Sequence, residues 1–320
     1  MIVHRFALLA LGSLLAGGSF STCRGAAESG SSTGNSGKPG VVAEVELPGV
    51  DTSALTPRER REWSAYVSET IAPCADTPVP LAQCVKEKRA CAKCLPAAKF
   101  LVAQVREGRT REQATETYKA RFDNDKVKSI DVDGSPVQGP ASAPVTIVEW
   151  ADFECPHCRA VMPVLEQTVE KFPGKVRLIF KNYPLSIHSH AEPAARAAIA
   201  AGVQGKFWEM HHKLFKATAL ETPDIERYAK DLGLGVEKLK SDMAAESTTA
   251  RIEKDKKSAE AVGFAGTPLI FINGREFHGS GDFVADLEEW IRLELELGGD
   301  PSPNPVAPPK PAPSGSAKPQ

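Results

Sequence analysis

The sequence lacks any large excess of charge of one sign. Among its 320 residues, 39 are Lys or Arg and 41 are Asp or Glu, so the formal net charge is -2. A charge this close to zero creates no overall field that would attract nucleic acid or an anionic membrane, and we expect neither as a partner. The chain also has no internal repeat. Its 42% of apolar residues excludes disorder over the whole length.

A long hydrophobic run is missing as well. The apolar stretch near the start, residues 6–16, is about half the ~20 residues that a membrane-spanning helix needs. It follows His4 and Arg5 and precedes small and polar residues, an order that is typical of an export signal. We therefore expect the protein to reach the periplasm or cell envelope, which is an oxidising compartment.

The end of this signal has two interpretations. Residues 20–23 have the outline of a lipoprotein signal, in which Cys23 would become the lipid-bearing N-terminus, although Phe20 and Thr22 depart from the usual pattern. Ordinary cleavage near residues 25–27 fits equally well. Cys23 is therefore a candidate lipidation site, and the export signal is assigned to residues 1–23.

Composition divides the rest of the chain into parts with different properties. Residues 24–55 are a flexible linker rich in Gly and Ser, and residues 298–320 are a Pro-rich tail that we expect to be disordered. Residues 56–128 predict a small cysteine-containing helical unit, because apolar side chains recur at helical spacing after the N-cap candidates Thr56 and Thr110.

The part from 141 to 297 predicts a mixed α/β fold. A β-branched segment at 145–150 indicates a buried strand, a helix is expected at 155–172, and a second strand is expected at 176–180. A helical insert at about 186–263 comes next, before a hairpin turn at Asn273-Gly274 and a last helix at 283–297. This order of elements is typical of an α/β sandwich.

A C-x-x-C motif, Cys155-Pro156-His157-Cys158, falls where the first predicted strand meets its helix. The backbone N–H groups at a helix N-terminus favour a thiolate, which is the nucleophile of disulfide exchange. Cys158 lies one turn further on and can close a disulfide with Cys155. We predict that Cys155 is the solvent-exposed nucleophile and Cys158 the resolving cysteine, with His157 adding a donor and partial positive charge.

Two other interpretations of this motif are weaker. It could be half of a zinc site, but residues 141–297 contain no second C-x-x-C pair, and their histidines show no ligand spacing. It could be an inert disulfide, which would not need the position between strand and helix. We expect no metal. His188 and His190 are interpreted as capping or core-rim residues rather than ligands.

Together these residues resemble the thioredoxin-fold oxidoreductases, and among them the DsbA-like branch, over about residues 141–296. The Pro-His dipeptide is characteristic of that branch, Glu149 matches its buried acid, and Pro163 matches the kink proline of its active-site helix. Gly266-Thr267-Pro268 matches the loop whose cis-proline lies opposite the disulfide. The resemblance implies a thioredoxin-like fold with a helical insert. It also implies catalytic roles for Cys155, Cys158, His157, Pro156 and Glu149, and substrate contacts at Thr267 and Pro268.

The resemblance also implies the function. We expect an exported thiol:disulfide oxidoreductase, acting as an oxidase that passes the Cys155–Cys158 disulfide to cysteine-containing exported proteins. Such an enzyme needs no cofactor beyond its redox-active disulfide, and a membrane redox partner would re-oxidise it. Two alternatives stay open. One is a reductase or isomerase, and the other is a binding module that holds cysteine-containing clients without oxidising them, for example in cytochrome assembly.

Four further cysteines, at positions 74, 84, 91 and 94, lie in the helical unit, and we predict that they form two structural disulfides. If one helix runs over residues 80–92, Cys84 is about 10 Å from Cys91 and about 15 Å from Cys94, beyond disulfide reach. The predicted pairs are therefore Cys74 with Cys84 and Cys91 with Cys94. A four-cysteine zinc site and a second redox pair at Cys91 and Cys94 remain as alternatives.

Overall fold

The computed structural model describes residues 43–279 and 282–298 of the chain. The predicted export signal with Cys23 lies outside this range, and so does the Pro-rich tail from residue 299 onward. Among the helices within it, none combines the length and the apolar character that crossing a membrane requires.

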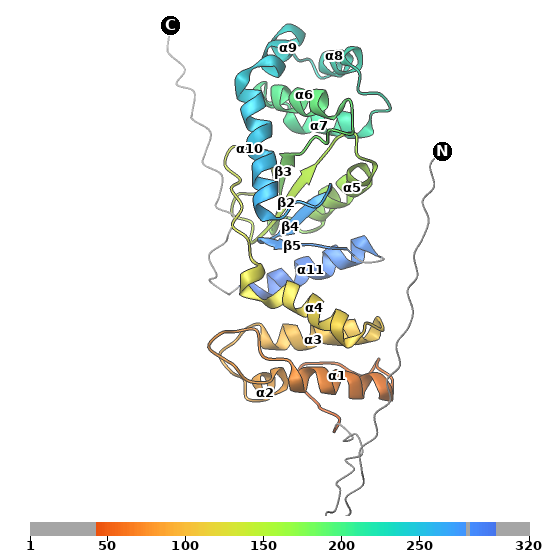
Figure 1. The fold of residues 1–320 in the computed structure, drawn as a ribbon, viewed down its shortest axis with the longest axis vertical. Helices are drawn as coiled ribbons and strands as arrows, with labels where there is room; N and C mark the ends of the chain where they lie inside the picture. Colours follow the sequence, from red (N-terminus) through yellow and green to blue (C-terminus); the bar gives the residue numbers. More distant parts are fainter. Residues whose placement is uncertain (1–42, 280–281, 299–320) are drawn as a thin grey trace, which may run out of the picture. The chain divides into compact units, whose positions relative to one another are not determined.

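The helical unit contains four α-helices, and two of them begin as the sequence predicts (Figure 1). Thr56 and Thr110 each cap a helix in a capping box. The threonine side chain accepts from the backbone N–H three residues later, and the side chain of that later residue accepts from the threonine N–H. The core of the unit includes the fully buried Trp63, whose indole N–H donates to the carbonyl of Ala98 at 3.0 Å. The four helices are α1 (Pro57–Glu69), α2 (Leu81–Lys86), α3 (Cys94–Arg106) and α4 (Arg111–Phe122).

The disulfides of this unit differ from the predicted pairs. Cys74 is bonded to Cys91, with 5.9 Å between the Cα atoms, and Cys84 is bonded to Cys94, with 6.1 Å. The predicted pairs are wrong because the helix does not continue to residue 92. α2 ends at Lys86, and Lys88 adopts a positive φ of 50°. The chain therefore turns back and places Cys94 at the start of α3, beside Cys84.

A five-stranded mixed sheet follows, with strand order β1-β3-β2-β4-β5. β2 pairs in parallel with β3 and antiparallel with β4, and every residue of these three strands is buried. Such burial is typical of a sheet that is covered on both faces. The strands are β1 (Val137–Gln138), β2 (Val145–Ala151), β3 (Val176–Asn182), β4 (Leu269–Ile272) and β5 (Arg275–Glu276).

Helices cover the sheet on both sides, which confirms the predicted α/β sandwich. α5 (Pro156–Lys171) and α11 (Phe283–Leu297) pack Leu165 and Ile291 against Ile147 of β2. α10 (Glu246–Val262) packs against the opposite side, where Ala259 joins Trp150 in one apolar cluster. The insert between β3 and β4 supplies the remaining helices, α6 (Ala191–Val203), α7 (Phe207–Lys216), α8 (Thr222–Asp231) and α9 (Val236–Ala244).

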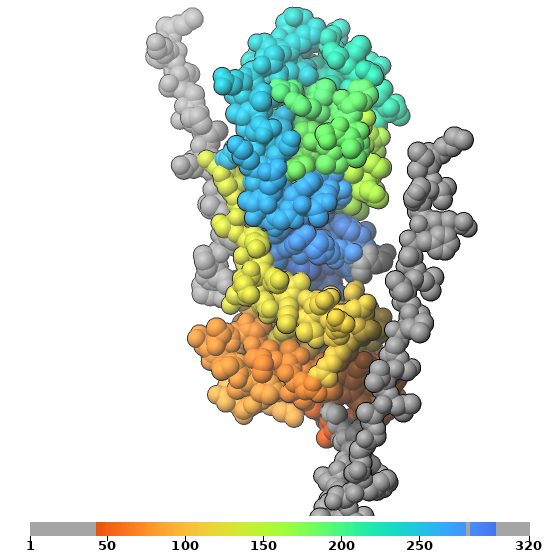
Figure 2. Space-filling view, in the orientation of Figure 1, coloured from red at the N-terminus to blue at the C-terminus, as the bar shows by residue number. Residues whose placement is uncertain are grey.

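The helical unit packs against the α/β part through α4 and α11, whose atoms touch in Figure 2. Arg121 of α4 is 2% exposed and donates to Glu294 of α11 at 2.6 Å. Its guanidinium also lies 4.1 Å from the ring centroid of Trp290. From the sheet, Arg275 donates to the carbonyl of Asp123. These buried polar contacts fix the orientation of α4 on α11.

Candidate active site

Cys155 is the N-cap residue of α5, directly after the turn that ends β2. Its backbone N–H donates to the carbonyl of Asp152 at 3.1 Å, and Pro156 occupies the first helical position, where a missing N–H costs nothing. Cys158 is the third residue of the helix. Neither cysteine is bonded to another in the described structure, which therefore shows the dithiol form of the pair.

The two thiols are more buried than the sequence predicts. Cys155 is 4% exposed and Cys158 is fully buried, while Pro156 and His157 between them are exposed. The prediction that Cys155 is solvent-exposed is wrong, because the loop before β4 covers it, with the Thr267 carbonyl 3.6 Å from its Sγ. Burial, and after it the charge of Glu149, raises the pKa of the Cys158 thiol. Cys158 therefore remains protonated at neutral pH.

Glu149 lies at the middle of β2, in register with Phe180 on one side and Ile270 on the other. It is fully buried, as expected from its apolar neighbours in the sequence, and neither carboxylate oxygen has a hydrogen-bond partner among the described residues. Burial, with a smaller contribution from Glu166, raises the pKa of Glu149 to about 8. The carboxyl is therefore mostly protonated at neutral pH.

The loop before β4 supplies the other side of the site. The Thr267–Pro268 peptide bond is cis, as the family resemblance implies. Pro268 directly precedes β4, the strand that pairs with β2, so the sheet brings this loop to the N-terminus of α5. The fold thus gathers Cys155, Cys158, Thr267 and Pro268 from segments more than 100 residues apart.

The turn before Cys155 is held by Asp152, a residue that the sequence did not indicate as part of the site. Asp152 is 1% exposed, and it accepts hydrogen bonds from the backbone N–H of Glu154 at 2.7 Å and of Leu185 at 2.9 Å. Its Oδ2 atom also lies 2.8 Å from Nδ1 of His188. The contact with Glu154 could have been predicted from the sequence, because an Asp side chain commonly accepts a hydrogen bond from the backbone N–H two residues later. The partners at 185 and 188 lie more than 30 residues away and leave no local pattern.

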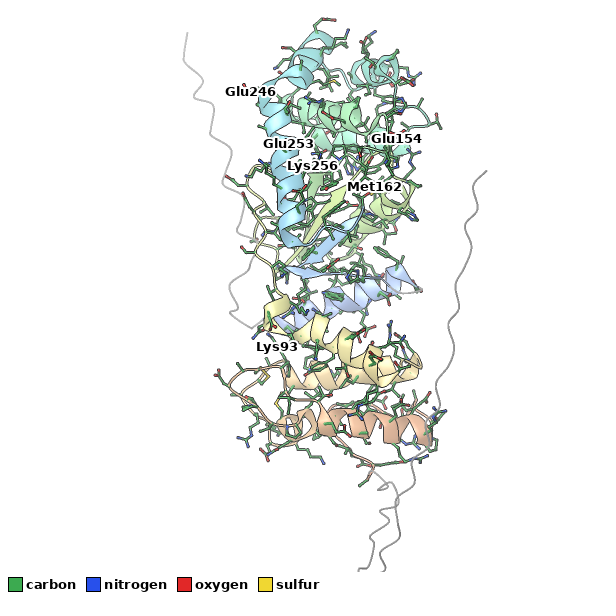
Figure 3. All side chains as sticks on the ribbon, in the orientation of Figure 1. Lys93, Glu154, Met162, Glu246, Glu253 and Lys256 are labelled. Carbon is green, nitrogen blue, oxygen red and sulfur yellow. A yellow bond between two sulfur atoms is a disulfide. The ribbon has the colours of Figure 1, made fainter. Side chains whose placement is uncertain are left out.

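A second carboxylate–imidazole contact joins the same two segments. Glu154, labelled in Figure 3, accepts from the backbone N–H of His190 at 2.8 Å and lies 3.1 Å from its Nδ1 atom. Burial raises the pKa of Glu154, but the hydrogen bonds from His190 outweigh it, so the pKa is lowered overall. The contact with Glu154 also raises the pKa of His190, the N-cap residue of α6. The active-site turn is therefore tied twice to the start of the insert.

One group of donors could hold a metal ion, although the sequence predicts none. Oε1 of Glu166 lies 2.6 Å from Nε2 of His212 and 3.7 Å from Nδ1 of His211, and all three atoms lie within 4.8 Å of one another. His211 is fully buried, and burial lowers its pKa well below the usual range. Histidine spacing alone could not reveal this group, because its carboxylate comes from α5, 46 residues before His212.

Comparison with known proteins identifies the family. The Thioredoxin_4 family, described as thioredoxin, matches residues 131–292, and the chain belongs to it. This membership confirms the DsbA-like resemblance and the thioredoxin-like fold with inserted helices. The matched residues include Cys155 and Cys158, the C-x-x-C pair.

Curated relatives match about half of the chain. The Na(+)/H(+) antiporter NhaA 3 of Salinispora tropica is 39% identical over 157 residues, which are 48% of this chain and 24% of that protein. The Na(+)/H(+) antiporter NhaA of Herminiimonas arsenicoxydans is 35% identical over 154 residues, again 48% of this chain and 24% of the relative. The chain thus spans about a quarter of the length of the curated relatives it matches.

Solved structures also match about half of the chain. BdbD from Bacillus subtilis in its oxidised form is 26% identical, with a TM-score of 0.47, over 53% of this chain and 97% of that one. A thioredoxin-like oxidoreductase from Silicibacter pomeroyi is 29% identical, with a TM-score of 0.46, over 55% of this chain and 97% of that one.

Proposed function

We propose that this protein is an exported disulfide oxidase that donates the Cys155–Cys158 disulfide to cysteine-containing exported proteins. The observation that carries the proposal is the position of Cys155 at the N-cap of the 16-residue helix α5. Free backbone N–H groups of the first turn stabilise a thiolate there. Stabilising the thiolate stabilises the reduced pair, which makes the corresponding disulfide a stronger oxidant.

The reaction proceeds by two exchanges. A client thiolate attacks Sγ of Cys155, the Cys155–Cys158 bond breaks, and Cys158 leaves and takes a proton. A second client thiolate then attacks the client sulfur of the mixed disulfide, so the client leaves with its own disulfide and Cys155 is released as a thiolate. Two electrons pass from client to enzyme.

Glu149 serves in this scheme as the proton donor for Cys158. Its carboxyl is buried, and its pKa of about 8 keeps the proton available at neutral pH. Burial, and after it the charge of Glu149, raises the pKa of the Cys158 thiol, so an ionised Glu149 favours the protonated form of Cys158. A proton that moves from Glu149 to the departing Cys158 avoids a buried thiolate, which is costly in an apolar environment.

The remaining residues are assigned to the client and the active-site loop. Pro156 and His157 are exposed beside the two thiols, so both can contact a bound client. Thr267 and Pro268 flank Cys155 and are proposed to bind the client backbone next to the reacting sulfur. No cofactor beyond the disulfide is needed. A membrane redox partner would re-oxidise the dithiol in the periplasm or envelope, where Cys23 could carry a lipid anchor.

Two assays with the full-length exported chain test the proposal. In the first, the oxidised protein is mixed with a reduced, unfolded disulfide protein, and formation of client disulfides is followed. In the second, insulin reduction by dithiothreitol is followed with and without the protein. We expect fast client oxidation that the Cys155→Ser variant loses, with little insulin reduction. Insulin reduction without client oxidation would show a reductase, and client binding without either activity would show a binding module.

A further inference from the structure

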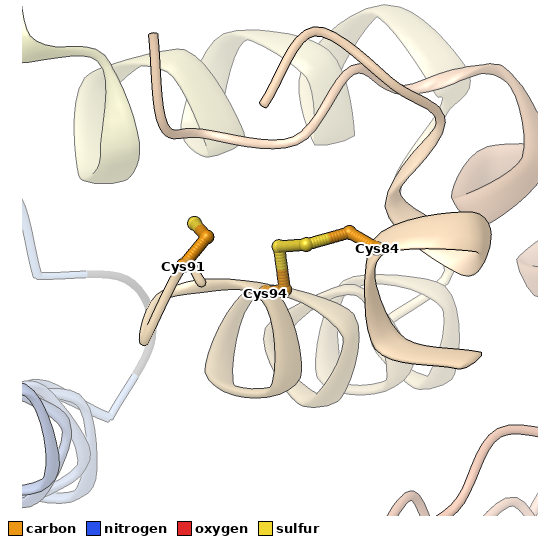
Figure 4. A group of neighbouring side chains, drawn as sticks. All are labelled: Cys84, Cys91 and Cys94. Atoms are coloured by element: carbon orange, nitrogen blue, oxygen red, sulfur yellow. A yellow bond between two sulfur atoms is a disulfide. The ribbon is translucent and has the colours of Figure 1, made fainter. Parts of the chain in front are cut away.

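The two disulfides of the helical unit lie against each other. The Sγ atoms of Cys84, Cys91 and Cys94 all lie within 4.8 Å of one another. In Figure 4 the Cys91 side chain stands beside the Cys84–Cys94 bond, with its sulfur on the same side of α3. Cys91 itself is bonded to Cys74. Sγ of Cys91, in the Cys74–Cys91 disulfide, thus lies close to both sulfurs of the Cys84–Cys94 disulfide.

Access from solvent is unequal among the four cysteines. Cys84, Cys91 and Cys94 are buried, at 0%, 8% and 3% exposure, whereas Cys74 is partly exposed. Cys74 also lies in the irregular segment between α1 and α2. An external thiolate therefore reaches the Cys74 sulfur first, and attack there releases Cys91 into the interior of the cluster.

The backbone is arranged so that Cys91 can bond to Cys94. The N–H of Cys94 donates to the carbonyl of Cys91 at 3.2 Å, closing a turn that keeps the two Cα atoms within about 7 Å. That separation falls at the limit of disulfide geometry. Between them, Lys93 (labelled in Figure 3) is 9% exposed and donates to Asn124 at 3.2 Å, which holds the start of α3 in place.

We propose that the four-cysteine cluster is a second disulfide-exchange site, which accepts two electrons from an exported dithiol through Cys74 and converts to a Cys91–Cys94 disulfide. Before the exchange the cluster holds the Cys74–Cys91 and Cys84–Cys94 disulfides. The Cys91–Cys94 disulfide that the sequence suggested would then form only after two electrons have entered. This activity goes beyond the proposed oxidase function and requires neither Cys155 nor Cys158.

The exchange takes place in three steps. A donor thiolate attacks Sγ of Cys74, the Cys74–Cys91 bond breaks, and Cys91 leaves as a thiolate. Cys91 then attacks Sγ of Cys94, the Cys84–Cys94 bond breaks, and Cys84 leaves and is protonated. The second donor thiol attacks the donor sulfur bonded to Cys74, which releases the oxidised donor and the Cys74 thiol. The two donor protons end on Cys74 and Cys84, and two electrons enter the cluster.

Dithiothreitol is a suitable probe donor, and the test uses the full chain with the substitutions Cys155→Ser and Cys158→Ser. The protein is treated with one equivalent of dithiothreitol, quenched in acid and alkylated. Trypsin cuts after Lys86, Arg89 and Lys93, and endoproteinase Asp-N cuts before Asp76, so each of the four cysteines falls on its own peptide. Mass spectrometry then gives the connectivity of the species that has gained two electrons.

We expect several-fold more label on Cys74 and Cys84 than on Cys91 and Cys94, together with a linked Cys91–Cys94 peptide pair. Label on Cys74 and Cys91 with the Cys84–Cys94 bond intact would overturn the proposal, as would a folded protein in which neither disulfide is reduced. The control variant Cys84→Ser with Cys94→Ser removes the acceptor bond, and label should then appear on Cys91 with Cys74. The labelling of the unaltered cluster decides the question even where that control does not fold.

Discussion

Nδ1 of His188 lies 2.8 Å from Oδ2 of the buried Asp152, and this contact ties the segment after β3 to the turn that precedes Cys155. The same oxygen accepts the backbone N–H of Leu185. The turn that carries Cys155 is therefore held by a side chain outside the C-x-x-C motif. Cys155 itself bonds through its backbone to Asp152 and Arg159, and its Sγ lies near the Thr267 carbonyl.

Asp152→Ala should lower the free energy of unfolding by about 1–3 kcal/mol, because it leaves the partly buried backbone N–H groups of Glu154 and Leu185 without this partner. It should also slow disulfide exchange, since the turn that presents Cys155 loses its anchor. Urea unfolding and the rate of client oxidation measure the two effects.

Asp51→Ala is a matched control, because the side chain of the exposed Asp51 also accepts from a backbone N–H two residues later, that of Ser53 at 2.8 Å. That variant should change stability by less than about 0.5 kcal/mol. Equal stability and rate for both variants would show that Asp152 does not position Cys155.

Glu149 should make the reduced protein less stable as the pH rises. Its pKa is raised from an ordinary value of 4.5 to about 8, so between these values the native protein holds more protons than the unfolded chain. Stability therefore falls as pH increases through this range and levels off above it. Glu149→Gln should remove the effect, with a stabilisation of a few kcal/mol at pH 8 and little change at pH 5.

The same substitution should slow the chemistry, because Gln cannot protonate the departing Cys158. We expect about a 100-fold slower attack on the Cys155–Cys158 disulfide at neutral pH. Stopped-flow measurement of client oxidation gives the rate, and Glu260→Gln, on the exposed side of α10, is the control. A Glu149→Gln enzyme with an unchanged rate and pH profile would remove Glu149 from the mechanism.

Iodoacetamide should label Cys155 before Cys158 in the reduced protein. Cys158 is fully buried, and burial raises the pKa of its thiol, so the reactive thiolate is scarce there. Peptide mapping after brief alkylation measures the order. Cys158→Ser should accumulate mixed disulfides with clients, whereas Cys155→Ser should trap none. Faster labelling of Cys158 would reverse the assignment of nucleophile and resolving cysteine.

Arg121→Ala should weaken the junction between the helical unit and the α/β part. Arg121 is buried against Glu294 and the ring of Trp290, and its loss leaves a largely buried carboxylate unpaired. We expect a loss of about 3–5 kcal/mol in unfolding free energy. Arg292, which is exposed on α11 and pairs with Glu288 at 3.1 Å, offers the control, and Arg292→Ala should cost less than about 1 kcal/mol. Similar costs for both variants would contradict a structural role for the buried pair.

The sequence predicted the elements whose signals are local. The last helix, Phe283–Leu297, and the caps at Thr56 and Thr110 fall where expected, because capping and helical periodicity act within a few residues. The burial of Glu149 is confirmed for the same reason, since its apolar neighbours in β2 reveal a buried strand. The position of the C-x-x-C at the junction of strand and helix also follows from local pattern.

The features that were missed depend on contacts that no local pattern records. The chain turns after Lys86 without a Gly or Pro to indicate it, so the predicted helix was too long and the cysteine pairs were wrong. Cys155 is covered by a loop 112 residues later in the chain, so its burial could not be read from its neighbours. Two-residue strands such as β1 are too short to show alternation.

The reduction potential of the Cys155–Cys158 pair tests the proposed oxidase function most directly. The protein is equilibrated in glutathione buffers, quenched and alkylated, and the labelling of Cys155 and Cys158 is read peptide by peptide, so that the other cysteines do not contribute. We predict an oxidising potential, above about -180 mV, because the N-cap position of Cys155 favours the reduced form. A strongly reducing potential of about -270 mV would contradict the proposed oxidase function and indicate a reductase.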